Sequence, residues 1–220
     1  MIKYSQNSQD SLNILNKSLF IFDFDGVLVD SNNIKSIAFA KIYDSYGANV
    51  VRKVVQHHSE NGGMSREDKF KLYHDKFLKL EIMDSEILNL SEKFTNLVLE
   101  EVMQCSEIEG VTEILNYCME QGIICAIASA SPEVELKKII SLRPWSNVFK
   151  YKFGSPESKV SNINKILNIT SIPKNKAIFF GDSSNDLDAA KKCQIDFIGI
   201  NFNSSDMTGF RELLNNEGLV

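Results

Sequence analysis

The sequence predicts an α/β protein with a parallel five-stranded sheet flanked by helices and an all-helical block inserted after the first strand. Five short apolar runs with helical segments between them indicate the sheet, because such runs are typical of strands buried on both faces. Residues 35–107 indicate the insertion, because helical patterns follow one another there without a convincing strand. We therefore expect a core domain of residues 1–34 and 108–220 and a helical cap domain of residues 35–107.

The composition of the 220 residues, 43% hydrophobic and 24% charged, excludes disordered and fibrous proteins. The net charge of −5 argues against broad phosphate neutralisation on a nucleic acid, but it allows a small anionic substrate held by a few local cations. No apolar run approaches the roughly 20 residues of a membrane helix, and residues 1–18 lack the apolar core of a signal peptide. We expect a cytoplasmic protein with no membrane or nucleic-acid partner. The sequence does not reveal its oligomeric state.

The apolar runs locate the elements. Strands are expected at residues 19–22, 123–128, 148–153, 177–180 and 197–200. Helices are expected at 111–119, which Gly122 ends, then after the N-cap Ser131, and at 159–167 and 186–193. The cap should hold three helical segments, at 33–46, after the N-cap Ser65, and from Asp84 onward. The four cysteines form no CxxC pair and are expected to be buried thiols.

Two acidic clusters follow strands of the expected sheet. Asp23 and Asp25 come directly after the first strand, where strand periodicity points both carboxylates to one side and Gly26 lets the chain turn. Neighbouring carboxylates repel each other, and a bound cation or a shared proton relieves the repulsion. Asp182 and Asp186 follow the fourth strand. If the two strands are neighbours, the four carboxyl groups form an oxygen-rich pocket suited to Mg²⁺. Taken separately, Asp23 and Asp25 are also compatible with an acidic turn, and Asp182 and Asp186 with helix N-caps.

Two further residues complete a candidate phosphate site. Ser129 ends the second strand beside the backbone N–H groups of Ala130 and the next helix, a cradle for a phosphate or an oxyanion. Lys159 follows a turn-rich link and would balance negative charge. Considered alone, Lys159 is more typical of a solvated surface lysine.

Four motifs follow one another along the chain: DFDGV, a strand that ends in Ser129, Lys159, and GDSSND. Their order resembles that of the haloacid dehalogenase superfamily of phosphohydrolases. The resemblance covers about residues 18–36 and 108–205. It implies a Rossmann-like core, with the inserted helices as a helical cap.

The resemblance also implies a role for each residue. Asp23 would attack phosphorus and form an aspartyl-phosphate. Asp25 would protonate the leaving oxygen and then deprotonate water, which requires it to hold a proton at working pH. Ser129 and Lys159 would hold phosphoryl oxygens. Mg²⁺ would bind the Asp23 carboxylate, the Asp25 backbone carbonyl and Asp182, with Asp186 a ligand or close behind.

A motif in the expected cap indicates which branch of the superfamily the chain resembles. Gly63 and Arg66 lie in GGMSRED, which resembles the cap loop of β-phosphoglucomutase, where the arginine contacts the substrate's second phosphate. The mutase has a cap histidine where this chain has Lys35, so we favour a phosphatase acting on a small phosphorylated metabolite. Asp25 argues against the dehalogenase branch and against a Schiff base at Lys53.

Three readings therefore remain open. The favoured reading is a Mg²⁺-dependent phosphatase with Gly63 and Arg66 near the substrate. The alternatives are a phosphosugar mutase and a catalytically silent binding module on the same fold. His57 and His58 diverge on a helix, so they are not expected to bind a metal together, although one of them could touch the substrate.

Overall fold

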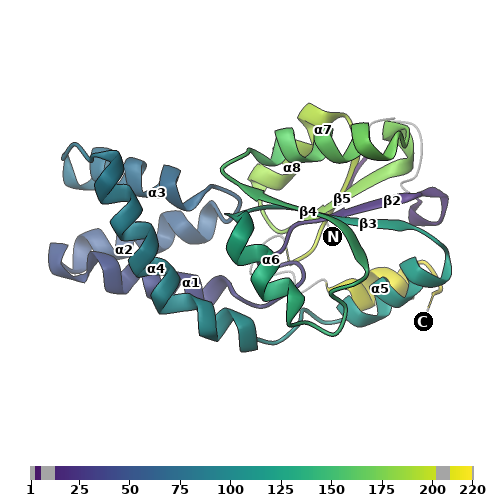
Figure 1. Cartoon of the computed structure of the whole chain (residues 1–220), viewed down its shortest axis with the longest axis horizontal. Coiled ribbons are helices and arrows are strands. Elements are labelled where there is room, and N and C mark those ends of the chain that lie inside the picture. Colours follow the sequence, from purple (N-terminus) through teal and green to yellow (C-terminus); the bar gives the residue numbers. More distant parts are fainter. Residues whose placement is uncertain (1–2, 6–12, 202–208, 220) are drawn as a thin grey trace.

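The computed structural model describes residues 3–5, 13–201 and 209–219. Its centre is a six-stranded sheet with the order β1-β6-β5-β2-β3-β4 (Figure 1). The strands are β1 (Lys3–Tyr4), β2 (Leu19–Phe22), β3 (Ile124–Pro132), β4 (Phe149–Ser155), β5 (Ala177–Gly181) and β6 (Asp196–Gly199). The five expected strands are confirmed, and β2 to β6 pair in parallel. The sixth, β1, pairs antiparallel with β6 and was not predicted because it has only two residues and no apolar run.

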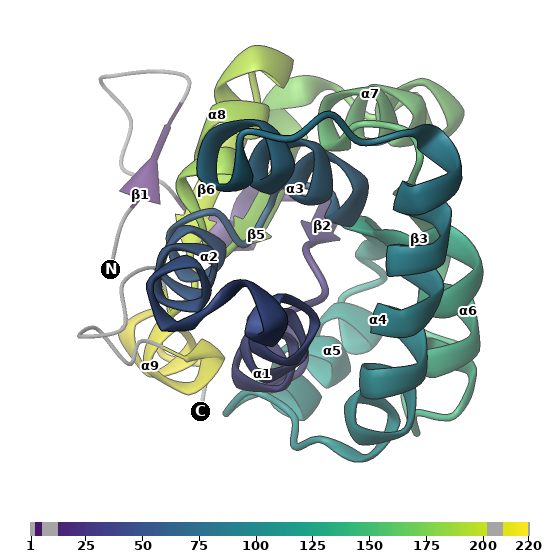
Figure 2. The same cartoon turned by 90° about the vertical axis from the view of Figure 1, so that its left-hand side faces the viewer.

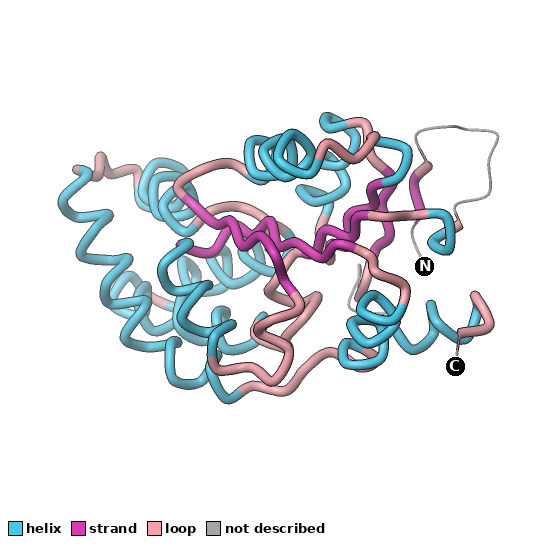
Figure 3. Tube along the Cα trace, turned by 45° about the vertical axis from the view of Figure 1, so that its right-hand side comes forward, coloured by secondary structure: helices cyan, strands magenta, loops and turns pink. Residues whose placement is uncertain are grey.

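Helices cover both faces of the sheet (Figures 1 and 3). One face carries α7 (Lys159–Thr170) and α8 (Ser184–Cys193), and the other carries α5 (Val111–Glu120), α6 (Glu133–Ser141) and α9 (Phe210–Asn216). Leu19 and Ile21 pack into the cluster under α7 and α8, whereas Phe20 and Phe22 pack into the opposite cluster. This alternation explains why β2 is apolar at every position.

The insertion between β2 and β3 forms a helical bundle beyond one end of the sheet, which we call the cap (Figures 1 and 2). Its helices are α1 (Asn32–Tyr43), α2 (Ala48–Glu60), α3 (Arg66–Tyr73) and α4 (Asp84–Gln104), with a π turn at His74–Leu78. An aromatic cluster holds them together: Phe39 packs on Phe70, Tyr73 and Phe94, and all four are buried. The prediction of three helical segments was wrong. α2 lies outside the three expected segments, although His57 and His58 were expected to lie on a helix; its β-branched run, VVRKVV, is not typical of a helix.

Two helix starts differ from the expected ones. α6 begins at Glu133 with Pro132 at the N-cap position, and the Ser131 hydroxyl donates to Asp25 Oδ2 (2.6 Å) instead of capping the helix. α8 begins at Ser184, so the expected first residue, Asp186, is its third. Ser131 is therefore a residue of the candidate site.

The remaining expectations concern the burial of the cysteine thiols and membrane-spanning helices. All four cysteines are free, and Cys118, Cys125 and Cys193 are buried, but Cys105 is only half-buried. In the described part of the chain, no helix has both the length and the apolar character needed to cross a membrane.

Candidate active site

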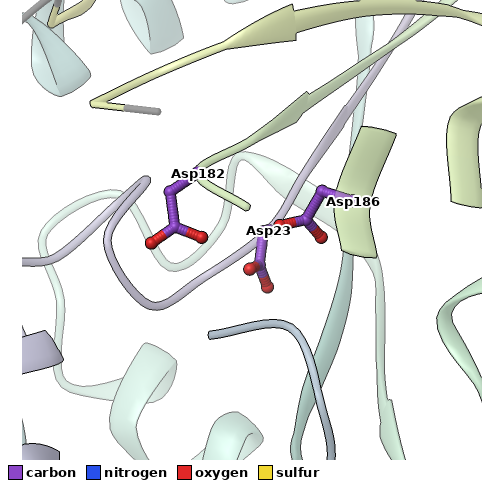
Figure 4. A group of neighbouring side chains, drawn as sticks. All are labelled: Asp23, Asp182 and Asp186. Atoms are coloured by element: carbon purple, nitrogen blue, oxygen red, sulfur yellow. The ribbon is translucent and has the colours of Figure 1, made fainter. Parts of the chain in front are cut away.

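The two acidic clusters meet because their strands are neighbours. β2 and β5 pair with Phe22 opposite Phe180, and the Asp23 backbone N–H donates to the Phe180 carbonyl (2.8 Å). Asp23 and Asp182 each follow these strand ends, and Asp186 lies in the first turn of α8. Figure 4 shows the three side chains converging. One oxygen from each lies within 4.8 Å of the others, the grouping expected of a metal site.

A single lysine partly balances the three carboxyl groups. Lys159 Nζ donates to Asp23 Oδ2 (2.7 Å) and to Asp186 Oδ1 (2.5 Å). Burial raises the pKa of Asp23 to about 7; the Lys159 charge opposes this shift and the Asp186 charge adds to it. Burial and the charges of Asp186 and Asp23 raise the pKa of Asp182 to about 8. Burial would lower the pKa of Lys159, but the Asp186 and Asp23 carboxylates raise it instead. Only when all three carboxyl groups are ionised does the cluster carry more negative charge than Lys159 balances.

The free oxygen positions fit a hard divalent cation. Asp182 Oδ1 is buried without a hydrogen-bond partner, whereas Asp182 Oδ2 accepts from Asn32 Nδ2 (2.8 Å). Both Asp186 oxygens are already used, since Oδ2 accepts from the Ser183 hydroxyl (2.5 Å) and backbone N–H (3.1 Å). Carboxylate oxygens are the ligands that Mg²⁺ prefers, so this donor set fits the ion. Asp182 therefore offers the free oxygen of the cluster, whereas both oxygens of Asp23 and both of Asp186 accept hydrogen bonds.

The structure holds Asp25 as a carboxylate, in contrast to the expected protonated acid. Its Oδ2 lies 2.5 Å from Lys35 Nζ and 2.6 Å from the Ser131 hydroxyl, and its Oδ1 accepts from the Ser31 hydroxyl (2.5 Å). Burial raises the pKa of Asp25, but the Lys35 charge and these hydrogen bonds outweigh burial and lower it to about 2. Ser31 and Asn32 were missed, although two polar residues at the start of α1 were a signal for groups turned toward the strand end.

Ser129 and Ala130 line a cavity of about 40 Å³ between the core and the cap. Asp23 and Asp25 line the same cavity. The Ser129 side chain is almost fully buried, and its hydroxyl accepts from the Ser131 backbone N–H (3.1 Å). The phosphate cradle expected from the sequence therefore opens onto the same space as the candidate nucleophile.

The cap loop lies directly on the core. A Cβ at Gly63 would fall 2.8 Å from Ser183 Oγ, 2.9 Å from Asn185 Cβ and 3.3 Å from Lys159 Nζ. Only glycine allows this approach without displacing core atoms. Gly63 was predicted to contact substrate, and the structure places it against the core residues that surround Lys159.

Arg66 lines the cavity, but a core residue already binds its guanidinium. Arg66 makes a bidentate ion pair with Glu135 of α6 (2.8 and 3.1 Å), donates to Thr95 Oγ1 (2.8 Å) and stacks over Phe94. The predicted N-cap Ser65 is confirmed, because its hydroxyl accepts from the Asp68 backbone N–H (3.2 Å). Glu135 was missed because nothing in the pattern of α6 marks it as the partner of a cap residue.

Comparison with known proteins identifies the family of the chain. The family model for haloacid dehalogenase-like hydrolases matches residues 20–200. The chain belongs to the haloacid dehalogenase-like hydrolase family. A phosphorylated carbohydrates phosphatase of Thermotoga maritima is 26% identical over 190 residues, which cover 81% of this chain and 82% of the relative. These matches confirm the expected enzyme class, a haloacid dehalogenase-like phosphatase.

Solved structures of this family share the fold. A putative haloacid dehalogenase-like hydrolase of Bacteroides fragilis has a TM-score of 0.70 at 15% identity, covering 89% of this chain and 93% of that chain. CbbY of Rhodobacter sphaeroides, solved in complex with xylulose-(1,5)bisphosphate, has a TM-score of 0.66 at 16% identity and coverages of 88% and 91%. These neighbours confirm the expected core with a helical cap.

In this haloacid dehalogenase-like hydrolase, the remaining candidate residues differ in whether they line the cavity. His58 lines the cavity together with Lys69, a buried residue that the sequence analysis missed. His57 instead contacts the Tyr73 hydroxyl through Nδ1 (3.3 Å), and Lys53 is exposed on α2. Of the two histidines, only His58 is therefore placed to face a ligand.

Mg²⁺ should stabilise the folded protein, and more so at about pH 8 than at about pH 5. In the metal-free fold, burial favours the protonated forms of Asp23 and Asp182, while the unfolded carboxyls ionise near pH 4. Their contribution to stability is therefore lost as pH rises toward 7 and 8, and a bound cation restores it. At 100 times its Kd, Mg²⁺ should add about 2.7 kcal/mol. Thermal unfolding of wild type and Asp182→Asn measures this.

Asp182→Asn should lose most of the Mg²⁺-induced rise in Tm. Asp188→Asn, an exposed change on α8, should keep it. A full Mg²⁺ shift in Asp182→Asn would contradict the assignment of Asp182 as a ligand.

Gly63→Ala should lower kcat/KM by at least about tenfold, because the added Cβ pushes the cap loop away from Lys159 and misplacements of about 1 Å are costly. Gly62→Ala is the matched control, since a Cβ there would meet its nearest atom, Asp182 Oδ1, at 3.6 Å, an ordinary contact. Steady-state kinetics on one substrate compares the two variants. A wild-type kcat/KM in Gly63→Ala would show that the loop tolerates the added Cβ, and an equal loss in Gly62→Ala would show that the close approach at Gly63 is not the cause.

Proposed function

We propose that the protein is a Mg²⁺-dependent phosphatase that hydrolyses a small phosphomonoester, such as a phosphorylated sugar, through an aspartyl-phosphate on Asp23. The observation that carries this proposal is the Asp23 carboxylate, held by Lys159 at the edge of the cavity that Ser129 and Ala130 line. The named activity of the Thermotoga maritima relative, on phosphorylated carbohydrates, supports the substrate class.

Asp23 is the proposed nucleophile. Lys159 holds Asp23 Oδ2, while Oδ1 accepts from the Phe24 backbone N–H (2.7 Å), so the carboxylate has one orientation. A fixed nucleophile avoids the entropy cost of positioning it during the reaction. Attack on phosphorus forms the aspartyl-phosphate and releases the alcohol, and water then hydrolyses this intermediate.

The phosphoryl oxygens face donors from the core. The Ser129 hydroxyl, the Ala130 backbone and the Lys159 ammonium are the proposed donors. Asp23, Asp182 and the Asp25 backbone carbonyl would hold Mg²⁺, which supplies positive charge for the transferring phosphoryl group when bound. Asp186 keeps Lys159 in place through its own ion pair.

Asp25 is the proposed acid and base. The contacts with Lys35, Ser131 and Ser31 keep its carboxylate ionised, the form that takes a proton from the hydrolytic water. To protonate a leaving oxygen, Asp25 must first lose its contact with Lys35 and take up a proton from solvent; it gives that proton to the leaving oxygen and regains one from the hydrolytic water. Lys35 therefore serves as the charge partner of Asp25 between these steps.

The two alternatives have less support. A mutase must keep water out and present a sugar hydroxyl, and Lys35 occupies the position of the cap histidine found in the mutase, with its ammonium on Asp25. Arg66, which would hold the second phosphate in a mutase, is paired with Glu135. A silent binding module has no need for Asp23, Lys159 and Asp182 in one charged cluster, which is costly to bury.

Asp23→Asn should abolish the release of inorganic phosphate from p-nitrophenyl phosphate and from a panel of sugar phosphates, because an amide is not a nucleophile. Asp25→Asn should lower turnover by about 10²-fold or more. Asp188→Asn serves as the matched control for a lost surface charge. Wild-type rates in Asp23→Asn would rule out the covalent mechanism, and an isomerised phosphosugar in place of phosphate would favour the mutase.

A further inference from the structure

The cavity between cap and core contains a buried ammonium group that no carboxylate neutralises. Lys69 of α3 is 2% exposed and lines the cavity. Its Nζ donates to His58 Nδ1 (2.8 Å), and no ion pair joins it to an acidic side chain within the described residues. Asp25 and Asp182 act on it only from beyond ion-pair distance. Lys69 thus differs from every other cation that lines this cavity.

Those other cations are already paired. Lys35 lies on Asp25, and Arg66 lies on Glu135. Lys159 is not one of the lining residues, and it too is paired, since Asp23 and Asp186 share it. The sequence analysis assigned Arg66 to an anionic part of the substrate, but in the structure Lys69 is the cation left without a counter-charge.

An unpaired buried ammonium is unfavourable unless a ligand compensates it. Removing a charge from water costs far more than burying an apolar group of the same size. Burial, with the Lys35 charge nearby, lowers the pKa of Lys69 to about 7. The Phe39 ring, with its centroid 5.8 Å from Nζ, supplies a cation–π contact at the outer limit of such distances, which compensates only a small part of this cost. The lysine is therefore better explained by something that enters the cavity.

His58 orients the ammonium toward that space. Burial and the Lys69 charge lower the pKa of His58 to about 2, so the ring is neutral. Because an ammonium only donates, Nδ1 is the acceptor, and this contact holds Lys69 in one position. The cap supplies Lys69 and His58 to the cavity, whereas the core supplies Asp23, Ser129 and Ala130. Cationic and reactive groups therefore face the same cavity from opposite sides.

We propose that Lys69 binds a second anionic group of the substrate, a carboxylate or a phosphate remote from the phosphoryl group that is transferred. The preferred substrates are then small, doubly anionic phosphomonoesters. This inference rests on the proposed phosphatase function. It adds that Lys69, positioned by His58, determines specificity.

The test uses matched substrates that differ in one anionic group. Glycerol 3-phosphate is compared with 3-phosphoglycerate for the carboxylate, and fructose 6-phosphate with fructose 1,6-bisphosphate for the phosphate. Wild type should favour the doubly anionic member of at least one pair by tenfold or more in kcat/KM. Lys69→Met should reduce that ratio by at least tenfold, and Lys69→Arg should keep most of it. Lys71→Met, an exposed change on the same helix, should keep the wild-type ratio.

Stability separates recognition from a structural role. Lys69→Met removes an unpaired buried charge and should unfold at the same temperature as wild type or higher. A Tm several degrees lower, or equal losses of kcat/KM on both members of a pair, would show that Lys69 supports the cap and would overturn the proposal. If Lys69→Met does not fold, Lys69→Gln takes its place in the same comparison.

A failure of the phosphatase assignment gives a different result. In that case no substrate, p-nitrophenyl phosphate included, releases phosphate, and calorimetric titration with the same four compounds tests Lys69 directly. Tighter binding of a doubly anionic compound that is lost in Lys69→Met would support the anion site. A wild-type ratio near one in both pairs, in kinetics or in binding, would overturn it.

Discussion

The contact of Lys159 with Asp23 and Asp186 is the interaction on which the site depends. Without it, three carboxylates would lie together in a buried space with no counter-charge, which is strongly unfavourable. Two features of the fold produce this contact. β2 and β5 are neighbours, which brings Asp23 beside Asp182, and α7 begins at Lys159. The remaining negative charge and the unpartnered Asp182 Oδ1 leave room for a divalent cation.

The cavity between cap and core is small in the described arrangement. The cavity of about 40 Å³ is far smaller than the roughly 300–1,000 Å³ of a typical ligand site. Gly63 lies against Ser183 and Lys159, and Arg66 reaches across to Glu135, so the described arrangement is a closed one. Opening would separate that ion pair. In this arrangement Lys69 adds a cation to the wall of the cavity that Asp23 also lines.

Local patterns in the sequence predicted the core and its acidic strand ends, because buried strands are continuous apolar runs and the site residues follow them directly. Asp23, Asp182 and Ser129 could be located in this way. The pairs Asp25–Lys35, Arg66–Glu135 and Lys69–His58 could not, because each joins residues from separate elements whose partners no periodicity reveals. For the same reason, the sequence analysis expected a proton on Asp25. The ionised form depends on its charge partner Lys35, which lies in α1. α2 was missed for a local reason, its β-branched residues.

The most direct test of this account is the position of the phosphoryl group on the enzyme. Asp25→Asn slows hydrolysis of the intermediate, so acid quench after mixing with p-nitrophenyl phosphate, followed by peptide mass spectrometry, should capture it. The account predicts one added phosphoryl group on the peptide that contains Asp23, and none in a variant that also carries Asp23→Asn. A phosphoryl group on a different residue, or none during measurable turnover, would contradict it.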